Sequence, residues 1–130
     1  MTVVDASAVL EVLLRTTVGA RLERRLLARG GSLHAPHLID VEVAQVLRRY
    51  ESAGVLTLDR GKEAVADLAA FPLERYPHDV LLPRIWELRR NVTAYDAAYL
   101  ALAEALRASF VTCDGRLAAA PGHRVKVEVF

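Results

Sequence analysis

The fold is decided by one stretch near the end of the chain, Thr93 to Asp114, which is TAYDAAYLALAEALRASFVTCD. An acid, Asp96, stands at the start of an almost wholly apolar segment, and Asp114 directly follows a short apolar run. The pattern predicts a buried helix from Ala94 to about Arg107 and a strand from Ser109 to Cys113. Two acids at the polar ends of a buried helix–strand unit indicate a functional site.

The rest of the chain alternates strands with helices in the same way. Short apolar or β-branched runs predict strands at 2–4, 32–35 and 73–76, and the alternation of Val125, Val127 and Val129 predicts an edge strand. Amphipathic patterns predict helices at 6–14, 18–29, 38–52, 58–71 and 78–90. In the helix over 58–71, Val65, Leu68 and Ala69 are expected to face the core, and Pro83 is tolerated only in a first helical turn. We therefore predict an α/β fold with a parallel sheet of about four to five strands covered on both faces.

The composition limits the number of domains and the class of protein that the chain can form. The 130 residues, 53% of them apolar, suit one compact domain over residues 1–130. The single cysteine cannot form an internal disulfide, no signal peptide is apparent, and no apolar run approaches the ~20 residues that span a bilayer. A cytoplasmic protein without a membrane partner is expected. Because the formal net charge is only +1, affinity for nucleic acid must come from local clusters of cations.

The acids form a constellation at one edge of the predicted sheet. Ligands of open parallel sheets bind at the carboxyl ends of the strands, and two predicted strands end in an acid, Asp5 and Asp114. Helices that follow strands begin at this edge, so Asp96 and an acid early in the helix over 38–52 can converge there. Both Asp40 and Glu42 border the apolar stripe of that helix, and its pattern does not separate them.

Carboxylates gathered in one crevice repel one another, and this repulsion raises their pKa values. A hard divalent cation such as Mg²⁺ relieves the repulsion, and a bound metal can activate water for phosphodiester hydrolysis. Ser7 and Thr112 each lie two residues from an acid and are candidates to hydrogen-bond a carboxylate or a metal-bound water.

Each acid also has a structural interpretation. Asp5 can cap the helix that follows it, Thr93 and Asp96 have capping-box spacing, Asp114 begins a turn with a glycine, and Glu42 can interact with a helix dipole. These alternatives do not predict that all four acids should fall at one edge of the sheet.

Four segments in order resemble the PIN-domain ribonucleases, and specifically the toxins of VapBC toxin–antitoxin pairs. They are VVDASAVLEVLL (3–14), APHLIDVEVAQVLRR (35–49), TAYDAAYLALAEAL (93–106) and VTCDGRL (111–117). The resemblance implies a three-layer α/β/α fold with a catalytic pocket of Asp5, Glu42, Asp96 and Asp114, in which the three aspartates bind Mg²⁺ or Mn²⁺. It favours Glu42 over Asp40, because the family's second acid opens a segment of E-x-x-x-x-L-x-R type, here Glu42 to Arg49.

The resemblance also implies the function. It predicts a metal-dependent endoribonuclease that hydrolyses RNA, inhibits translation, forms a homodimer and is neutralised by a small antitoxin. The helices over 18–29 and 38–52 are candidates for the antitoxin groove, and the candidate RNA-phosphate contacts are Arg15, Arg48, Arg49 and Arg116. The alternatives are a non-catalytic RNA- or partner-binding PIN domain and a metal-dependent phosphatase-like domain with Asp5 as nucleophile. A haloacid-dehalogenase-type phosphatase needs a second aspartate where this chain has Ser7.

Overall fold

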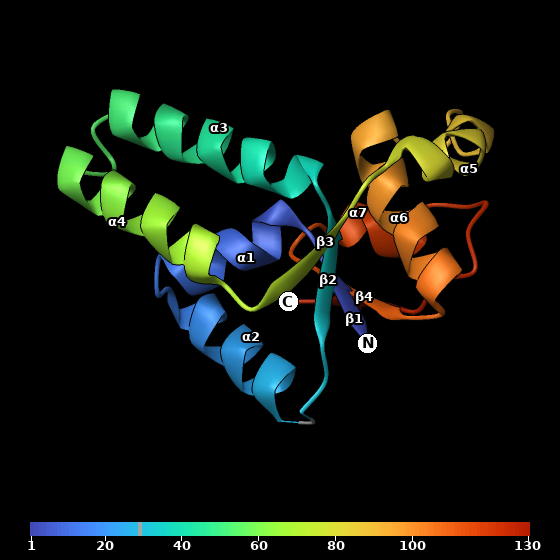
Figure 1. Ribbon diagram of the computed structural model, residues 1–130, viewed down its shortest axis with the longest axis horizontal. Coiled ribbons are helices and arrows are strands. Elements are labelled where there is room, and N and C mark those ends of the chain that lie inside the picture. The colour runs from blue at the N-terminus through green and yellow to red at the C-terminus, as the bar shows by residue number, and fades with distance from the viewer. Residues whose placement is uncertain (29) are drawn as a thin grey trace.

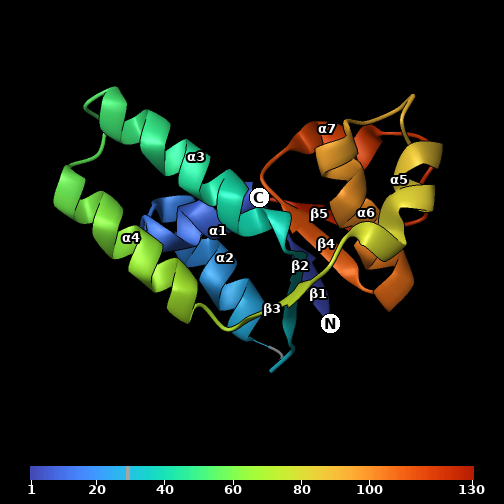
Figure 2. The same ribbon diagram turned by 45° about the horizontal axis from the view of Figure 1, so that its top comes forward.

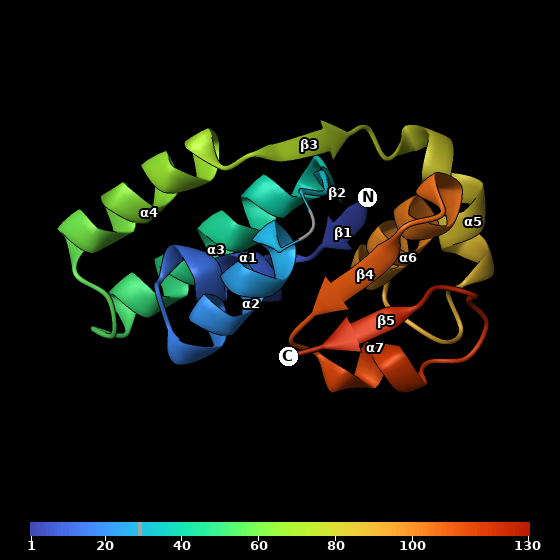
Figure 3. The same ribbon diagram turned by 90° about the horizontal axis from the view of Figure 1, so that it is seen from below.

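The computed structural model describes residues 1–28 and 30–130. Within them, five strands form one sheet in the order β3-β2-β1-β4-β5, and every neighbouring pair is parallel. This confirms the predicted α/β class. The strands are β1 (Thr2–Val4), β2 (Leu33–Pro36), β3 (Leu73–Tyr76), β4 (Ser109–Thr112) and β5 (Val127–Val129). Figure 3 shows β5 beside β4 at the sheet edge, with α7 close to it; Val125 precedes the strand.

The helices form two layers around this sheet. Figures 1 and 2 show α1 to α4 on one side of the strands and α5 to α7 on the other, the predicted three-layer arrangement. None of the helices in the described residues is long and apolar enough to cross a membrane. Their bounds are α1 (Ala6–Leu13), α2 (Thr17–Leu27), α3 (Leu38–Ser52), α4 (Leu58–Ala70), α5 (Leu82–Glu87), α6 (Ala94–Leu106) and α7 (Gly115–Ala119), and a 3₁₀ turn, η1 (Asp79–Leu81), precedes α5.

The structure tests details of the predicted helices over 58–71 and 78–90. In α4 the inward face was predicted correctly at Leu68, which is buried, and wrongly at Val65, which is 49% exposed, and at Ala69, which is exposed; Ala64 is buried instead. Residues four apart lie on one helix face, so Ala64 and Leu68 face the core together, and the predicted face extended one residue too far toward 65 and 69. Pro83 lies in the first turn of α5, as its missing N–H requires. The predicted end of the second helix, Arg29, lies outside the described residues.

Helix α6 is the most buried helix of the chain's described part. Every residue from Ala97 to Ala103 is buried, because one side packs against β1, β2 and β4 and the other against α5 and η1. The helix begins where Thr93 Oγ1 accepts a hydrogen bond from the Asp96 N–H at 3.2 Å. It ends at Arg107, whose left-handed φ of 52° reverses the chain into β4.

The order of the strands fixes where a ligand can bind. After β1, the chain adds β2 and then β3 on one side of it, and later adds β4 and β5 on its other side. The direction in which strands are added to the sheet therefore reverses between β1 and β4. Side chains at the carboxyl ends of these two strands border the crevice that such a switch creates. Val4 pairs with Val111, which brings Asp5 next to Thr112.

Candidate active site

An open cleft of about 650 Å³ lies at the carboxyl ends of β1 and β4. It is lined by residues of α1, α3, α6 and the segment after β4. All four acids singled out in the sequence line this cleft: Asp5, Glu42, Asp96 and Asp114. The fold therefore brings together carboxylates that lie up to 109 positions apart in the chain.

Asp5 is held more firmly than the other three. Its side chain is 7% exposed and accepts hydrogen bonds from Ser7 Oγ at 2.6 Å, the Ala8 N–H at 3.1 Å and Thr112 Oγ1 at 2.5 Å. Burial raises the pKa of Asp5, the hydroxyl and amide donors lower it, and the negative charge of Asp96 raises it further. Asp5 thus caps α1, as one structural interpretation proposed, while it also faces the other acids.

Ser7 and Thr112 connect the ends of β1 and β4 through this carboxylate. The Cys113 N–H donates to Ser7 Oγ at 2.9 Å, and the Asp114 N–H donates to Thr112 Oγ1 at 3.0 Å. Each hydroxyl therefore accepts from the backbone of one segment and donates to Asp5. The two hydroxyls fix the carboxylate of Asp5 and the backbone of the segment that carries Asp114.

Glu42 enters the cleft from the second turn of α3. Tyr99 of α6 donates its hydroxyl to Glu42 Oε1 at 2.7 Å. Burial raises the pKa of Glu42, and the charges of Asp5 and Asp96 raise it further, against the lowering effect of the Tyr99 hydrogen bond. Asp40 instead forms an ion pair with Arg75 of β3, at 2.8 Å from Oδ2 to Nε. The geometry separates the two acids that the helical pattern could not.

Asp96 and Asp114 differ in their surroundings. Burial raises the pKa of Asp96, and the charge of Asp114 raises it further. Asp114 caps α7 and forms a two-pronged ion pair with Arg116, with Nη2 at 2.6 Å from Oδ2 and Nε at 3.0 Å from Oδ1. This pair holds the pKa of Asp114 below its usual range.

The set of donors suits a hard cation. All four side chains offer carboxylate oxygens, the ligands that Mg²⁺ and Mn²⁺ prefer, and three of them have pKa values raised by burial and by neighbouring negative charge. Among residues 1–28 and 30–130, no three histidine, cysteine or acidic side chains already converge on one point as metal ligands do. The acids border a common space, and holding an ion between them would require side-chain rotations, which for Asp114 include release from Arg116.

The arginines singled out in the sequence are not all at the cleft. Arg49 lines it, and Arg116 lines an adjoining hollow of about 470 Å³ that shares Asp96 and Asp114 with the cleft. Arg15 lies 3.8 Å from Glu63 and, like Arg48, lines neither space.

Three side chains at the site were missed in the sequence. Tyr99 was not singled out, and only its position three residues after Asp96 signals that it shares a helix face with the acid. Arg89 and Arg90 line the adjoining hollow beside Arg116. Consecutive arginines at the end of an amphipathic helix carried no signal that distinguished them from solvated surface cations.

Comparisons with known proteins find a matching family model, similar sequences and similar folds. A family model described as PIN domain matches residues 2–122. The chain is 40% identical to Ribonuclease VapC12 of Mycobacterium tuberculosis over 129 residues, which cover 99% of this chain and 98% of that protein. The structure of PAE2754 from Pyrobaculum aerophilum is similar with a TM-score of 0.72 at 24% identity, covering 99% of this chain and 83% of that one. The structure of VapBC2 from Rickettsia felis, which is bound to a DNA fragment from the promoter, has a TM-score of 0.72 at 13% identity. The match covers 98% of this chain and 97% of that one.

Proposed function

The chain belongs to the PIN-domain family and, within it, to the VapC ribonucleases, the toxins of VapBC toxin–antitoxin systems, and from this premise we propose that the four-acid cleft is its active site. In this proposal the 130 residues act as one PIN domain that hydrolyses phosphodiester bonds within RNA and thereby inhibits translation in the cytoplasm. Membership in this family removes the reason for the phosphatase-like alternative.

Each acid has a distinct part in the proposed reaction. Asp5, Asp96 and Asp114 would hold Mg²⁺ or Mn²⁺, and the metal would supply Lewis-acid activation of water and offset negative charge at the scissile phosphate. Glu42 accepts a proton from, or orients, the attacking water through Oε2, because Tyr99 engages Oε1. Ser7 and Thr112 keep Asp5 in one orientation. We propose that Arg49, which lines the cleft, and Arg116, which lines the adjoining hollow, contact RNA phosphates, whereas Arg15 and Arg48 would contact only RNA outside the cleft.

One observation carries the proposal. Four carboxylates from α1, α3, α6 and the segment after β4 line one cleft, although burial and mutual repulsion disfavour the ionised forms of three of them, Asp5, Glu42 and Asp96. Such an arrangement is unfavourable for folding and is typical of a site that binds a cation or transfers a proton.

Partners follow from the family. A VapBC system implies a VapB antitoxin, and we propose that an antitoxin segment binds along α3, where Val41 and Tyr50 are exposed beside the cleft. Helix α2, with its arginines, is the second candidate surface. A homodimer and an RNA substrate complete the proposed assembly.

The decisive experiment compares substrates and acids. Purified protein is incubated with structured RNA, single-stranded DNA and a chromogenic phosphomonoester, in Mn²⁺ or in EDTA. We expect RNA cleavage in Mn²⁺ alone, lost in Asp5→Asn and Asp96→Asn and kept in Asp59→Asn, which changes an exposed acid at the start of α4. Full cleavage by both cleft variants would refute the assignment of the site, and RNA binding without any cleavage would favour the non-catalytic alternative.

A further inference from the structure

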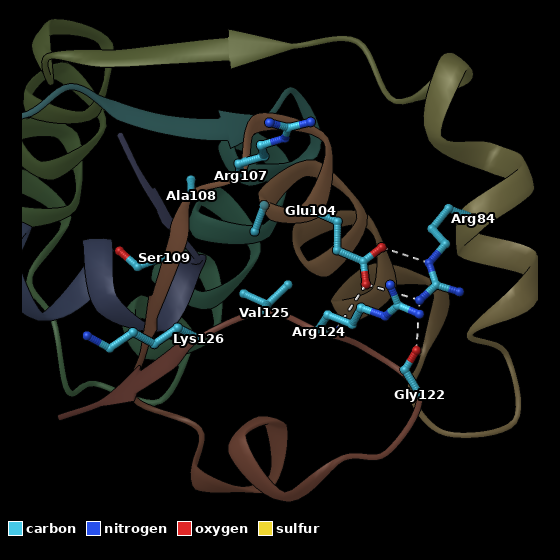
Figure 4. A pocket seen from close by; sticks show the side chains of 10 residues that line it. Arg84, Glu104, Arg107, Ala108, Ser109, Gly122, Arg124, Val125 and Lys126 are labelled. Atoms are coloured by element: carbon cyan, nitrogen blue, oxygen red, sulfur yellow. Dashed lines mark hydrogen bonds and ion pairs between the residues drawn. The ribbon is translucent and has the colours of Figure 1, made fainter.

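A second hollow, of about 980 Å³, lies at the opposite edge of the sheet from the acids. It is formed where α6 ends, β4 begins and the loop before β5 passes beneath them, and we call it the rear basic pocket. Figure 4 shows its lining. The charged residues in it are Arg84, Glu104, Arg107, Arg124 and Lys126.

An ion-pair network builds the pocket. Arg84 of α5 donates from Nε and Nη2 to the two carboxylate oxygens of Glu104 on α6, at 2.8 and 3.0 Å, and from Nη2 to the Gly122 carbonyl at 2.7 Å. The Arg124 N–H donates to the same carboxylate at 3.3 Å. Figure 4 shows these contacts converging on Glu104. They join α5, α6 and the loop, so the fold sets the positions of the Arg84 side chain and of the Arg124 backbone.

Two of those cations have no partner in the described part of the chain. The backbone of Arg124 is bonded to Glu104, but its guanidinium and that of Arg107 make no hydrogen bond or ion pair with any described residue. Lys126 is 81% exposed, and its contact with Glu128 is long, at 4.0 Å. Glu104 is already paired with Arg84. The four cations and one acid of the pocket give it a formal charge of +3, whereas the formal charge of the whole chain is +1.

The spacing of the cations indicates the kind of ligand. In Figure 4, Arg107 stands on one rim, Arg124 turns toward Glu104 and Arg84, and Lys126 lies toward the far end of the hollow. The cations line a hollow of about 980 Å³, a space that suits an extended chain of phosphates better than a single small anion. Arginine also matches phosphate geometry with its fork of donors.

We propose that the rear basic pocket is an exosite that binds backbone phosphates of the RNA substrate at a distance from the cleavage site. The proposal rests on the ribonuclease function and adds a second RNA contact to it. Helix α6 connects the two sites, since Asp96 lies in its first turn and Arg107 follows its last. Eleven residues separate them, a distance of about 16 Å along the helix axis. A folded RNA can contact both sites, and the pocket then contributes to affinity and KM without entering the chemical step.

The test measures RNA binding without cleavage. The Kd of fluorescein-labelled tRNA is measured by anisotropy in EDTA over a series of KCl concentrations, for the wild-type chain and for Arg107→Asn/Arg124→Gln. Asparagine tolerates the left-handed backbone of position 107, so the variant is designed to keep the fold. The control, Arg24→Gln/Lys62→Gln, removes the same charge from exposed positions of α2 and α4.

We expect the pocket variant to raise the Kd about tenfold and to reduce the slope of log Kd against log KCl by about two, one for each phosphate that the variant no longer neutralises. Its kcat in Mn²⁺ should equal that of the wild type. An equal change in the control would overturn the proposal. Unchanged RNA affinity with weakened antitoxin binding would overturn it too, because the pocket would then take an acidic protein segment. Failure of the nuclease proposal is recognised separately, by wild-type protein that binds tRNA but cleaves no RNA in Mn²⁺.

Discussion

The two ends of α6 carry opposite kinds of electrostatic arrangement. At its beginning, Asp96 faces three other carboxylates, and burial and mutual repulsion raise the pKa values of three of the four. At its end, Glu104 is fully matched by Arg84, which holds the pKa of Glu104 below its usual range. The negative charge of Glu104 is therefore neutralised within the rear basic pocket, whereas the negative charges of the acid cleft are not all neutralised within the cleft. We infer that the cleft depends on a ligand to balance its charge, whereas the ion pair behind the pocket stabilises the fold by itself.

The largest effect is expected from a matched pair of substitutions on α3. Glu42→Gln should lower kcat/KM for RNA by about 100-fold or more, because it removes the group proposed to accept or direct the proton of the attacking water. Asp40→Asn, two residues earlier, should keep near wild-type cleavage, since Asp40 pairs with Arg75 outside the cleft. Initial rates under single-turnover conditions test both. Equal losses would mean that α3 contributes through its stability alone.

The next effect should appear in stability and only at the other end of α6. Arg84→Gln leaves Glu104, whose side chain is 22% exposed, without its counterion and frees the Gly122 carbonyl. We expect a loss of about 1–2 kcal/mol in the free energy of unfolding, less than for a deeply buried pair because both side chains are partly solvated. Urea denaturation measures it. Arg84→Gln/Glu104→Gln should recover part of the loss, and kcat should not change in either variant.

The pH dependence of stability should distinguish the two ends as well. Asp5, Glu42 and Asp96 have folded-state pKa values raised above their unfolded values. Their ionisation therefore destabilises the folded chain as pH rises through the folded pKa, and the penalty is absent below the unfolded pKa. Without metal, the unfolding free energy should fall as pH rises from about 4 toward neutrality, the range above ordinary carboxyl pKa values. Adding Mn²⁺ at neutral pH should restore it, and Glu42→Gln or Asp96→Asn should flatten the slope. A metal-free chain that gains stability over this range would contradict the interpretation.

The sequence predicted which acids gather at one edge of the sheet better than it predicted the side chains that surround them. Strands that end in Asp5 and Asp114 locate both acids at one sheet edge by a general rule of parallel sheets, and no long-range contact is needed to apply it. The hydrogen bond from Tyr99 to Glu42 joins residues 57 positions apart, and no local pattern contains it. The rear basic pocket draws its cations from α5, α6 and the loop before β5, so it exists only once these segments pack together. The wrong face of α4 has a local cause, because Val65 looks more like a core residue than Ala64.

The smallest expected effect concerns Arg116, which pairs with an acid of the cleft and can be displaced from it. Arg84, at the other end of α6, is a more firmly held counterion, because its side chain is only 33% exposed and is bonded to Glu104, Glu87 and Gly122. Arg116 is 88% exposed, and among residues 1–28 and 30–130 its side chain bonds to Asp114 alone, so it can be displaced at little cost. Removing the Arg116 side chain frees Oδ2 of Asp114 for a metal, while Oδ1 still accepts the backbone N–H of residue 116, but it also removes a cation that lines the adjoining hollow.

Arg116→Gln should therefore tighten Mn²⁺ binding about twofold to fivefold, while the KM for RNA rises by a similar factor, since an exposed charge contact contributes little in either direction. Titration calorimetry of the metal and steady-state kinetics of cleavage measure the two effects separately. Arg90→Gln, in the same hollow but without a bond to Asp114, should change the KM and leave the Mn²⁺ affinity as it is. Weaker metal binding in Arg116→Gln would show instead that the arginine orients Asp114 for the metal, and that the two ends of α6 use their arginines in the same way.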